Sequence, residues 1–394
     1  MKDLTRVVHL PDVSHEGFAA LTAPTYRAST IVFDDAYAYA NRKHRGPDGY
    51  TYGLHGTPTT KTLEAYLTEL HRGERTVIVP SGQAGATIVF LTVLLPGDKV
   101  LIPDTAYPPV RGFCVNYLQP RGIDHVVYDP LIGSGVCDLI DARTKLVWVE
   151  SPGSTTMEFQ DLPAIVAAAR AKGALVGCDN TWATPLLFKP LEHGADFAME
   201  ALTKYVGGHS DLLLGSITVR DVAMHRRLKD TTRMIGIGVS PDECQLAIRG
   251  IQTLGVRLDH VGRVASDFAQ RIVGLPGVER VLHPVLPTCP GHELWRRDFA
   301  GASGLFSVVL KPNVGPRLDA ALSALKTFTI GASWGGVRSL IVPMDIRPDR
   351  VATTWREEGS ILRISIGLED PRDLWDDLEQ MFGAFAAAVP GEVA

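Results

Sequence analysis

The chain has 394 residues, of which 45% are hydrophobic and 21% are charged, with a formal net charge of −5 at pH 7, a balance typical of a globular protein of two or three domains. This charge offers no basic surface for nucleic acid, and no apolar run of about 18 residues could span a membrane, so neither is expected as a partner. The five cysteines are widely spaced without a CxxC pair, and the N-terminus lacks the apolar core of a signal peptide. We therefore expect a cytoplasmic protein with no metal site and no disulfide framework.

Residues 1–56 show neither helical nor strand periodicity. Prolines interrupt them, and glycines punctuate the stretch from Tyr50 to Gly56. Such a segment rarely packs alone. We expect it to be extended and to lie over another surface, its own or that of a neighbouring subunit.

Residues 57–250 alternate between helical periodicity and short apolar runs. Helices are predicted at 59–70, 84–95 and 162–171, and strands at 76–79, 99–102, 125–128, 145–149, 174–178, 197–201 and 215–219. Strands that are apolar throughout are typical of a mostly parallel sheet with helices on both faces. Ligands of such sheets bind at the carboxyl ends of the strands.

Residues 251–394 are predicted to form a second, smaller α+β domain. A long helix at 245–268 leads into it, strands are predicted at 304–310 and 361–366, and a final helix at 371–387. The fold class is therefore α/β, with a mostly parallel central sheet, flanking helices and an α+β C-terminal domain.

Lys204 and Asp179 are the two residues with the most specific chemistry. Lys204 lies between Thr203 and a glycine pair just after an apolar run, and Asp179 ends the preceding apolar run 25 positions earlier. A lysine amine can form an imine with an aldehyde, and a carboxylate can keep a pyridine nitrogen protonated, as pyridoxal phosphate requires. The alternatives are a solvated surface lysine and a carboxylate that caps the next turn.

Three further features match a phosphorylated aromatic cofactor. The amides of Gly82 and Gln83 open a predicted helix after a strand, where they can bind a phosphate, and the Thr203 hydroxyl can add to them. Tyr107, at the end of another strand, can stack on a flat ring and transfer a proton. The alternatives are an ordinary strand-to-helix turn and a core tyrosine.

Arg363 lies in an otherwise apolar predicted strand of the second domain. A buried guanidinium is costly unless it meets an anion, and its geometry suits a carboxylate. We assign it to the α-carboxylate of an amino-acid substrate, with a structural salt bridge as the alternative.

Together these motifs resemble the Cys/Met-metabolism family of pyridoxal phosphate (PLP) enzymes, of the aspartate-aminotransferase fold type I, over nearly the whole chain. The resemblance rests on residues 52–57, 81–86, 179–182, 203–211, 254–258, 291–293 and 366–370. It implies PLP bound to Lys204, an amino-acid thioether as substrate, and a homotetramer built as a dimer of dimers whose active sites are shared across the dimer.

Within the family, residues 105–108, 150–158 and 333–336 are most similar to enzymes that cleave cystathionine by β-elimination to homocysteine, pyruvate and ammonia in methionine biosynthesis. The resemblance implies that Ser333, Trp334 and Tyr52 line the substrate site and that Tyr52 also contacts the cofactor. Where the family commonly has an arginine that reaches the phosphate of a neighbouring subunit, this chain has Leu54, and His55 is a candidate substitute.

Three alternatives remain open from the sequence. The first is γ-elimination or γ-replacement, although the γ-enzymes usually carry an asparagine near Ser154 and a leucine at the position of Trp334. The second is broad carbon–sulfur lyase activity on cysteine conjugates. The third is a PLP-binding regulator without turnover.

Overall fold

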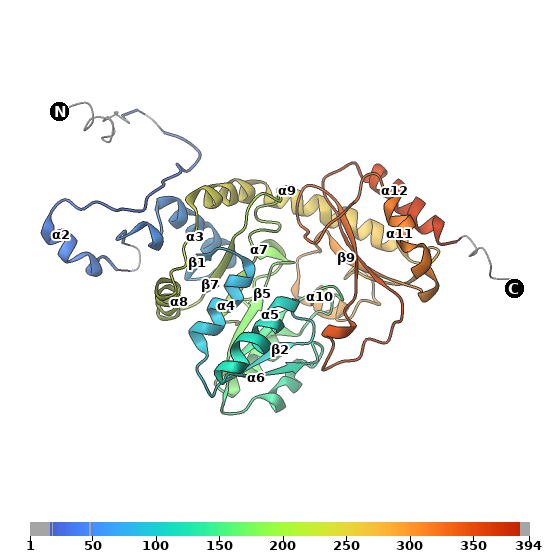
Figure 1. Ribbon diagram of the computed structural model, residues 1–394, viewed down its shortest axis with the longest axis horizontal. Helices are drawn as coiled ribbons and strands as arrows, with labels where there is room; N and C mark the ends of the chain where they lie inside the picture. Colours follow the sequence, from blue (N-terminus) through green and yellow to red (C-terminus); the bar gives the residue numbers. More distant parts are fainter. Residues whose placement is uncertain (1–15, 18, 47–48, 387–394) are drawn as a thin grey trace.

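The computed structural model describes residues 16–17, 19–46 and 49–386. In the described part of residues 16–56, the helices are the short α2 (Ala36–Ala40) and two single 3-10 turns, and α2 lies to one side of the body of the molecule (Figure 1). Arg27 joins this segment to the body through an ion pair with Asp242, with the closest atoms 2.5 Å apart. The prediction that residues 1–56 are extended and contact a neighbouring subunit stays a prediction.

The larger sheet has seven strands in the order β1-β7-β6-β5-β4-β2-β3. Only β7 runs antiparallel to its neighbours β1 and β6, so the prediction of a mostly parallel sheet is confirmed. The strands are β1 (Arg75–Val79), β2 (Lys99–Pro103), β3 (Asp124–Tyr128), β4 (Thr144–Glu150), β5 (Leu175–Asp179), β6 (Phe197–Glu200) and β7 (Gly215–Val219).

Helices cover both faces of this sheet. Successive residues of a strand point to opposite faces, so each strand contributes side chains to both helical layers. Val77 and Val79 pack in a core with α4 and α8, whereas Ile78 between them packs in a core with α3 and α9. The helices are α3 (Pro58–His71), α4 (Gly82–Val93), α5 (Pro108–Phe113), α6 (Leu162–Ala171), α7 (Thr184–Leu187), α8 (Val222–Met234) and α9 (Pro241–Ile272).

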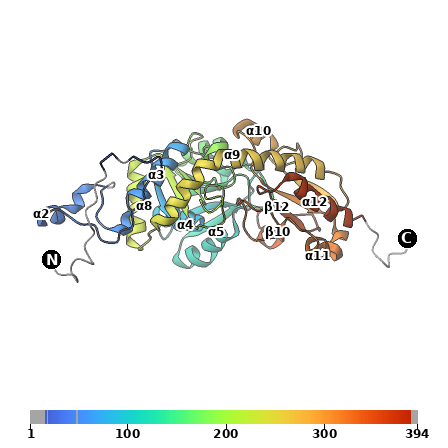
Figure 2. The ribbon, with the colours of Figure 1, turned by 90° about the horizontal axis from the view of Figure 1, so that it is seen from above.

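The second sheet has five strands in the order β10-β11-β12-β9-β8. Its strands are β8 (Val278–Leu282), β9 (Leu305–Leu310), β10 (Thr329–Ile330), β11 (Leu340–Met344) and β12 (Ile361–Ser365), and the accompanying helices are α10 (His292–Asp298), α11 (Gly315–Ser323) and α12 (Pro371–Ala384). The 32-residue helix α9 runs along the molecule from the first sheet to the second (Figure 2). The predicted boundary between residues 250 and 251 lies inside this helix, and the division into domains stays a prediction.

The helix α8 is the largest element that the sequence did not predict. Only His225, Leu228 and Thr232 are buried in it, and most of its residues are polar or charged, so few apolar residues mark it in the sequence. Across the described part of the chain, no helix is long and apolar enough to cross a lipid bilayer.

Candidate active site

A cavity of about 250 Å³ lies where the carboxyl ends of the parallel strands meet the second sheet. Asp179 is the last residue of β5, and Lys204 follows β6 by four residues. The C-terminal part of the chain contributes Ala332, Trp334 and Arg363 to the same wall. Of the residues assigned to the site from sequence, this cavity brings together Lys204, Asp179, Tyr107, Gly82, Gln83, Thr203, Trp334 and Arg363.

Lys204 is half-buried between the two parts of the chain. Its Nζ donates a hydrogen bond to Ser333 Oγ at 2.7 Å and lies 5.2 Å from the centre of the Trp334 ring. Burial and the nearby Arg363 guanidinium lower the pKa of Lys204 to about 8, against the opposite effect of Asp179. A lowered pKa raises the fraction of neutral amine near physiological pH, as a nucleophile or base requires.

Asp179 is fixed at the end of β5 by one of its two oxygens. Its Oδ1 accepts hydrogen bonds from Thr181 N at 2.9 Å and from Thr181 Oγ1 at 2.6 Å. These two contacts form the turn cap that the sequence analysis gave as the alternative role of Asp179. No described residue donates a hydrogen bond to Oδ2. Burial raises the pKa of Asp179. A ring cation beside Oδ2 would offset the cost of this buried charge.

Glu150, which the sequence analysis did not assign to the site, lines the same cavity. It ends β4 and lies next to Asp179 in the register of the parallel pair β4–β5. Burial and the neighbouring Asp179 raise the pKa of Glu150 to about 8. The signal that identified Asp179 was also present here, because Glu150 ends the apolar run of residues 145–149.

The N-terminus of α4 forms a cradle for an anion. Ser81 caps Ala84 N at 3.1 Å, and Gly85 N donates to Ser81 O at 3.1 Å. The amides of Gly82 and Gln83 have no acceptor among the described residues, and both residues line the cavity. A Cβ at Gly82 would lie 2.5 Å from Ala201 Cβ, so glycine is required for this close approach. Free amides at a helix start are suited to a phosphate.

The Thr203 hydroxyl is engaged elsewhere. It donates to Leu214 O at 3.1 Å and accepts from Leu214 N at 3.1 Å, which holds the residue before Lys204 against the start of β7. A hydroxyl has a single proton, so this structure directs it to Leu214 and not into the cradle. The role of Thr203 as a phosphate donor stays a prediction.

Arg363 faces the cavity without a carboxylate partner in the described part of the chain. Its Nη2 donates to Ala332 O at 2.9 Å and lies 3.5 Å from Ser333 O. Burial lowers the pKa of Arg363, and Tyr107 acts in the opposite direction. The structural salt bridge weighed as an alternative is therefore not found there, and the guanidinium is open to an anionic ligand.

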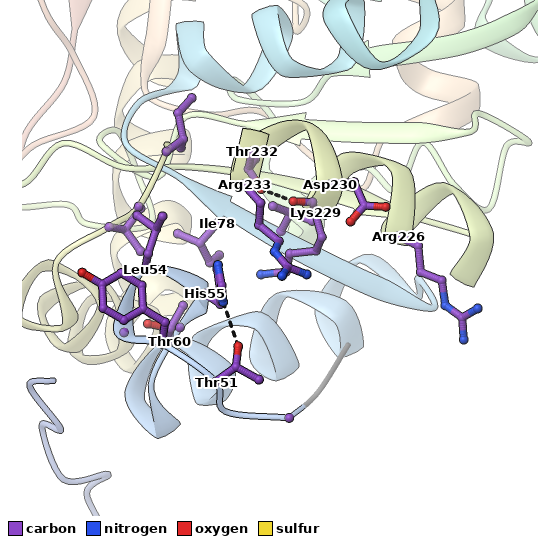
Figure 3. Close-up of a pocket in the computed structure, with 18 of the residues that line it drawn as sticks. Thr51, Leu54, His55, Thr60, Ile78, Arg226, Lys229, Asp230, Thr232 and Arg233 are labelled. Carbon is purple, nitrogen blue, oxygen red and sulfur yellow. Dashed lines mark hydrogen bonds between the residues drawn. The ribbon is translucent and has the colours of Figure 1, made fainter. Parts of the chain in front are cut away.

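Tyr52 lies apart from this cavity. It lines a separate cavity of about 680 Å³ between the N-terminal segment and α8. In Figure 3 the side chains of His55, Lys229 and Arg233 point toward one another in this cavity, with Leu54 nearby. The contact between Tyr52 and the cofactor is therefore not formed within one chain, and it stays a prediction for an assembly.

His55 is a poor substitute for the arginine usually found at the position of Leu54. Thr51 Oγ1 lies 2.9 Å from His55 Nδ1 (Figure 3), and burial together with Arg233 and Lys229 lowers the pKa of His55. A histidine with a lowered pKa is neutral at pH 7 and cannot supply the missing positive charge.

The residues of the 250 Å³ cavity fit pyridoxal phosphate. An amine with a lowered pKa, a carboxylate with a free oxygen and a pair of free amides occupy three parts of one cavity. Lys204 would hold the aldehyde end, Asp179 the ring nitrogen, and Gly82 with Gln83 the phosphate. The described residues contain no cluster of three or more His, Cys, Asp or Glu side chains that could hold a metal ion.

Comparison with known sequences gives a consistent picture. The model of the family "Cys/Met metabolism PLP-dependent enzyme" matches residues 4–383. A protein of Rhizobium johnstonii named "Putative cystathionine beta-lyase" is 42% identical, covering 97% of this chain and 96% of that protein. The cystathionine beta-lyase MetC of Escherichia coli is 38% identical, covering 92% and 93%. An L-alanine/L-glutamate racemase of Wolbachia pipientis is also 38% identical, covering 91% of each chain.

Solved structures agree with the fold. The structure of metB from Corynebacterium glutamicum superimposes with a TM-score of 0.85 at 29% identity, covering 93% of this chain and 94% of that one.

Proposed function

The chain belongs to the Cys/Met metabolism family of PLP-dependent enzymes, and on that premise we propose that it is a carbon–sulfur lyase that cleaves L-cystathionine by β-elimination. The products are L-homocysteine, pyruvate and ammonia. The observation that carries the proposal is the position of Lys204: its amine lies between Asp179 on one side and Ser333, Trp334 and Arg363 on the other. Relatives named as cystathionine β-lyases, at 38% and 42% identity over nearly the whole chain, support the same reaction.

When bound, PLP supplies the electron sink that stabilises negative charge at the substrate Cα. Arg363 binds the substrate α-carboxylate and so orients the Cα proton toward Lys204. Tyr107 accepts a proton from the substrate amine. Lys204 removes the Cα proton and returns a proton to the sulfur as the Cβ–S bond breaks, which releases homocysteine. Water then converts the remaining three-carbon fragment to pyruvate and ammonia.

The lowered pKa of Lys204 suits both of its steps. A base that must accept and then donate a proton works best when its pKa lies near the working pH. Ser333 Oγ, 2.7 Å from Lys204 Nζ, holds the amine at the wall formed by Trp334. With PLP bound, Asp179 would hold the ring nitrogen in its protonated form, which is the form that draws electrons from the substrate.

We further propose a homotetramer built as a dimer of dimers, located in the cytoplasm and active in methionine biosynthesis. The N-terminal segment supports an assembly, because it projects from the body and exposes Leu21, Val32 and Tyr37. The five cysteines are all unpaired, which is usual in a reducing compartment. In the assembly, Tyr52 reaches the active site of a neighbouring subunit.

Product analysis tests the reaction. After reconstitution with PLP, incubation with L-cystathionine is expected to yield homocysteine and pyruvate in equal amounts. Cysteine with 2-oxobutyrate would instead identify the γ-lyase alternative. Turnover of other cysteine conjugates at comparable rates would identify a broader carbon–sulfur lyase.

A racemase is the second candidate, because one relative at 38% identity is named as an alanine and glutamate racemase. Racemisation also begins with removal of the Cα proton, a step for which Lys204 could serve as the base. Chiral analysis of L-alanine and L-glutamate in the same preparation separates the two reactions. A protein that binds PLP but turns over none of these compounds would be the regulator weighed above.

A further inference from the structure

Glu150 occupies a position in the active site that the proposed chemistry does not use. It is the last residue of β4, it lines the 250 Å³ cavity, and its relative exposure is only 8%. It is the register partner of Asp179. Keeping two carboxyl groups side by side in a buried site is costly. The hydrogen bonds of the Glu150 carboxyl group should therefore indicate its role.

Both oxygens of Glu150 are engaged by the loops above the cavity. Oε2 accepts a hydrogen bond from Tyr107 N at 2.6 Å, and Oε1 accepts one from Ser154 Oγ at 2.6 Å. Both distances are short for hydrogen bonds in proteins. Glu150 thus joins the loop after β2 to the loop after β4.

The contact with Glu150 engages the backbone N–H of Tyr107, whose carbonyl in turn accepts a hydrogen bond from Val110 N at 2.8 Å. Pro108 and Pro109 follow Tyr107 at the start of α5, and no side chain caps this helix. Prolines have no N–H, so the amide of Tyr107 is the last backbone donor before the helix and Glu150 is its acceptor. The Tyr107 ring is 47% exposed, and no described residue hydrogen bonds to its hydroxyl. The direction of the ring therefore depends on its backbone.

The contact with Ser154 places the second loop against the first. Ser154 N donates to Thr105 O at 2.9 Å, while its hydroxyl donates to Glu150. Gly153 packs so closely on Thr105 that an added Cβ would lie 2.4 Å from it. Backbone contacts hold these loops together, and Glu150 sets how their two functional groups face the cavity.

We propose that Glu150 is a positioning residue: its carboxyl group fixes the Tyr107 backbone and the Ser154 hydroxyl so that the Tyr107 ring covers the cofactor at the distance the reaction needs. This inference rests on the proposed function for its kinetic consequence. The positioning of Tyr107 itself can be tested on the cofactor-free protein. Glu150 acts through these two groups and transfers no proton.

Two substitutions separate positioning from charge. Glu150→Ala removes both contacts. Glu150→Gln keeps both without charge, because its carbonyl oxygen can accept from Tyr107 N and its amide can donate to Ser154 Oγ. Should Glu150→Ala fail to fold, Glu150→Asp replaces it, since a side chain shorter by one methylene cannot reach both groups.

The first readout is hydrogen exchange of the cofactor-free protein, followed by mass spectrometry with overlapping peptides that isolate the Tyr107 amide. Glu150→Ala is expected to raise the exchange rate of this amide, and Glu150→Gln to leave it protected. Glu158→Ala is the matched control, because Glu158 lies in the loop after β4 and has the same 8% exposure as Glu150, but its side chain contacts Thr156 and Arg350 instead. It is expected to leave Tyr107 exchange unchanged.

The second readout is cofactor affinity and turnover. We expect Glu150→Ala to weaken PLP binding and to lower kcat by about 10- to 100-fold, the usual effect of a small misplacement, with Glu150→Gln within about threefold of wild type. Unchanged Tyr107 exchange and kcat in Glu150→Ala would overturn the proposal. So would a Glu150→Gln variant that is as slow as Glu150→Ala while its Tyr107 amide stays protected, because charge would then be the active property.

The proposed function and the positioning role of Glu150 can be contradicted independently. If neither wild type nor variants cleave cystathionine, the proposed function fails. Faster Tyr107 exchange and weaker PLP binding in Glu150→Ala would still support the positioning role in that case.

Discussion

Lys204 Nζ lies 2.7 Å from Ser333 Oγ, a contact between residues 129 positions apart in the sequence. It joins the loop after β6 to the loop before β11, and so links the amine of the first sheet to the substrate wall of the C-terminal part. The amine therefore has a defined direction only when these two parts of the chain are packed together. The reactivity of the Lys204 amine should therefore depend on the packing of the first sheet against the C-terminal part of the chain.

Replacement of the lysine is the most direct test of the site. Lys204→Ala is expected to abolish turnover and the visible absorbance of the reconstituted protein, because Lys204 is the one lysine among the described residues that line the cavity. Lys172→Ala, at the exposed end of α6, is the control and should keep both. Absorbance and turnover that persist in Lys204→Ala would show that the site lies elsewhere.

Cofactor uptake is expected to depend on pH through Lys204. Only the neutral amine attacks an aldehyde, so the rate of PLP uptake by cofactor-free protein should rise with pH and level off above a midpoint of about 8. Arg363 contributes to this lowered pKa, so Arg363→Ala should move the midpoint to higher pH. Stopped-flow absorbance from pH 6 to 10 measures it, and a wild-type midpoint near 10.5 would contradict the lowered pKa of Lys204.

The sequence identified the residues whose position follows from strand ends. Asp179 ends an apolar run, Lys204 and Tyr107 each follow one, and the carboxyl ends of parallel strands share one edge of a sheet. Gly82 could be assigned because the start of a helix after a strand leaves free amides. These local patterns were sufficient to select residues that line one cavity, and their roles stay predictions.

The features that could not be predicted from the sequence depend on how distant segments pack together. The hydrogen bond between Lys204 and Ser333 comes from the meeting of two sheets. The Thr203 hydroxyl bonds to Leu214 across a turn that periodicity does not reveal. The helix α8 is mostly polar and buries a single apolar residue, Leu228, so its packing on the sheet is not evident from composition. Glu150 was visible by the same signal as Asp179, but its role follows only from its contacts with two separate loops.

The pair Glu150 and Asp179 predicts how the stability of the cofactor-free protein varies with pH. The pKa of Glu150 is raised from 4.5 to about 8, so between these values the folded state holds a proton that the unfolded state has released. The free energy of unfolding should therefore fall as pH rises from about 4.5 to 8. Glu150→Gln should reduce this slope in thermal melts. A wild-type slope that equals that of Glu150→Gln would show that Glu150 ionises normally.

Arg363 is expected to control substrate binding more than folding. It meets only backbone carbonyls among the described residues, so Arg363→Lys should keep the fold while it loses the two-pronged contact to the α-carboxylate. We expect kcat/KM for cystathionine to fall by about 10- to 100-fold. Arg338→Lys is the control, because Arg338 is exposed in the loop before β11. Equal loss in both variants would point to a general effect on the C-terminal part.

Subunit complementation tests whether Tyr52 serves a neighbouring active site. Tyr52 lines a cavity separate from that of Lys204 in the same chain, so its contribution must come from another copy if it acts at all. Tyr52→Ala and Lys204→Ala are each expected to be inactive or strongly impaired alone. Co-expressed, they should form hybrid dimers in which one of the two sites has both native residues, giving about a quarter of wild-type activity. Activity that stays at the level of the separate variants would mean that Tyr52 does not complete a site in trans.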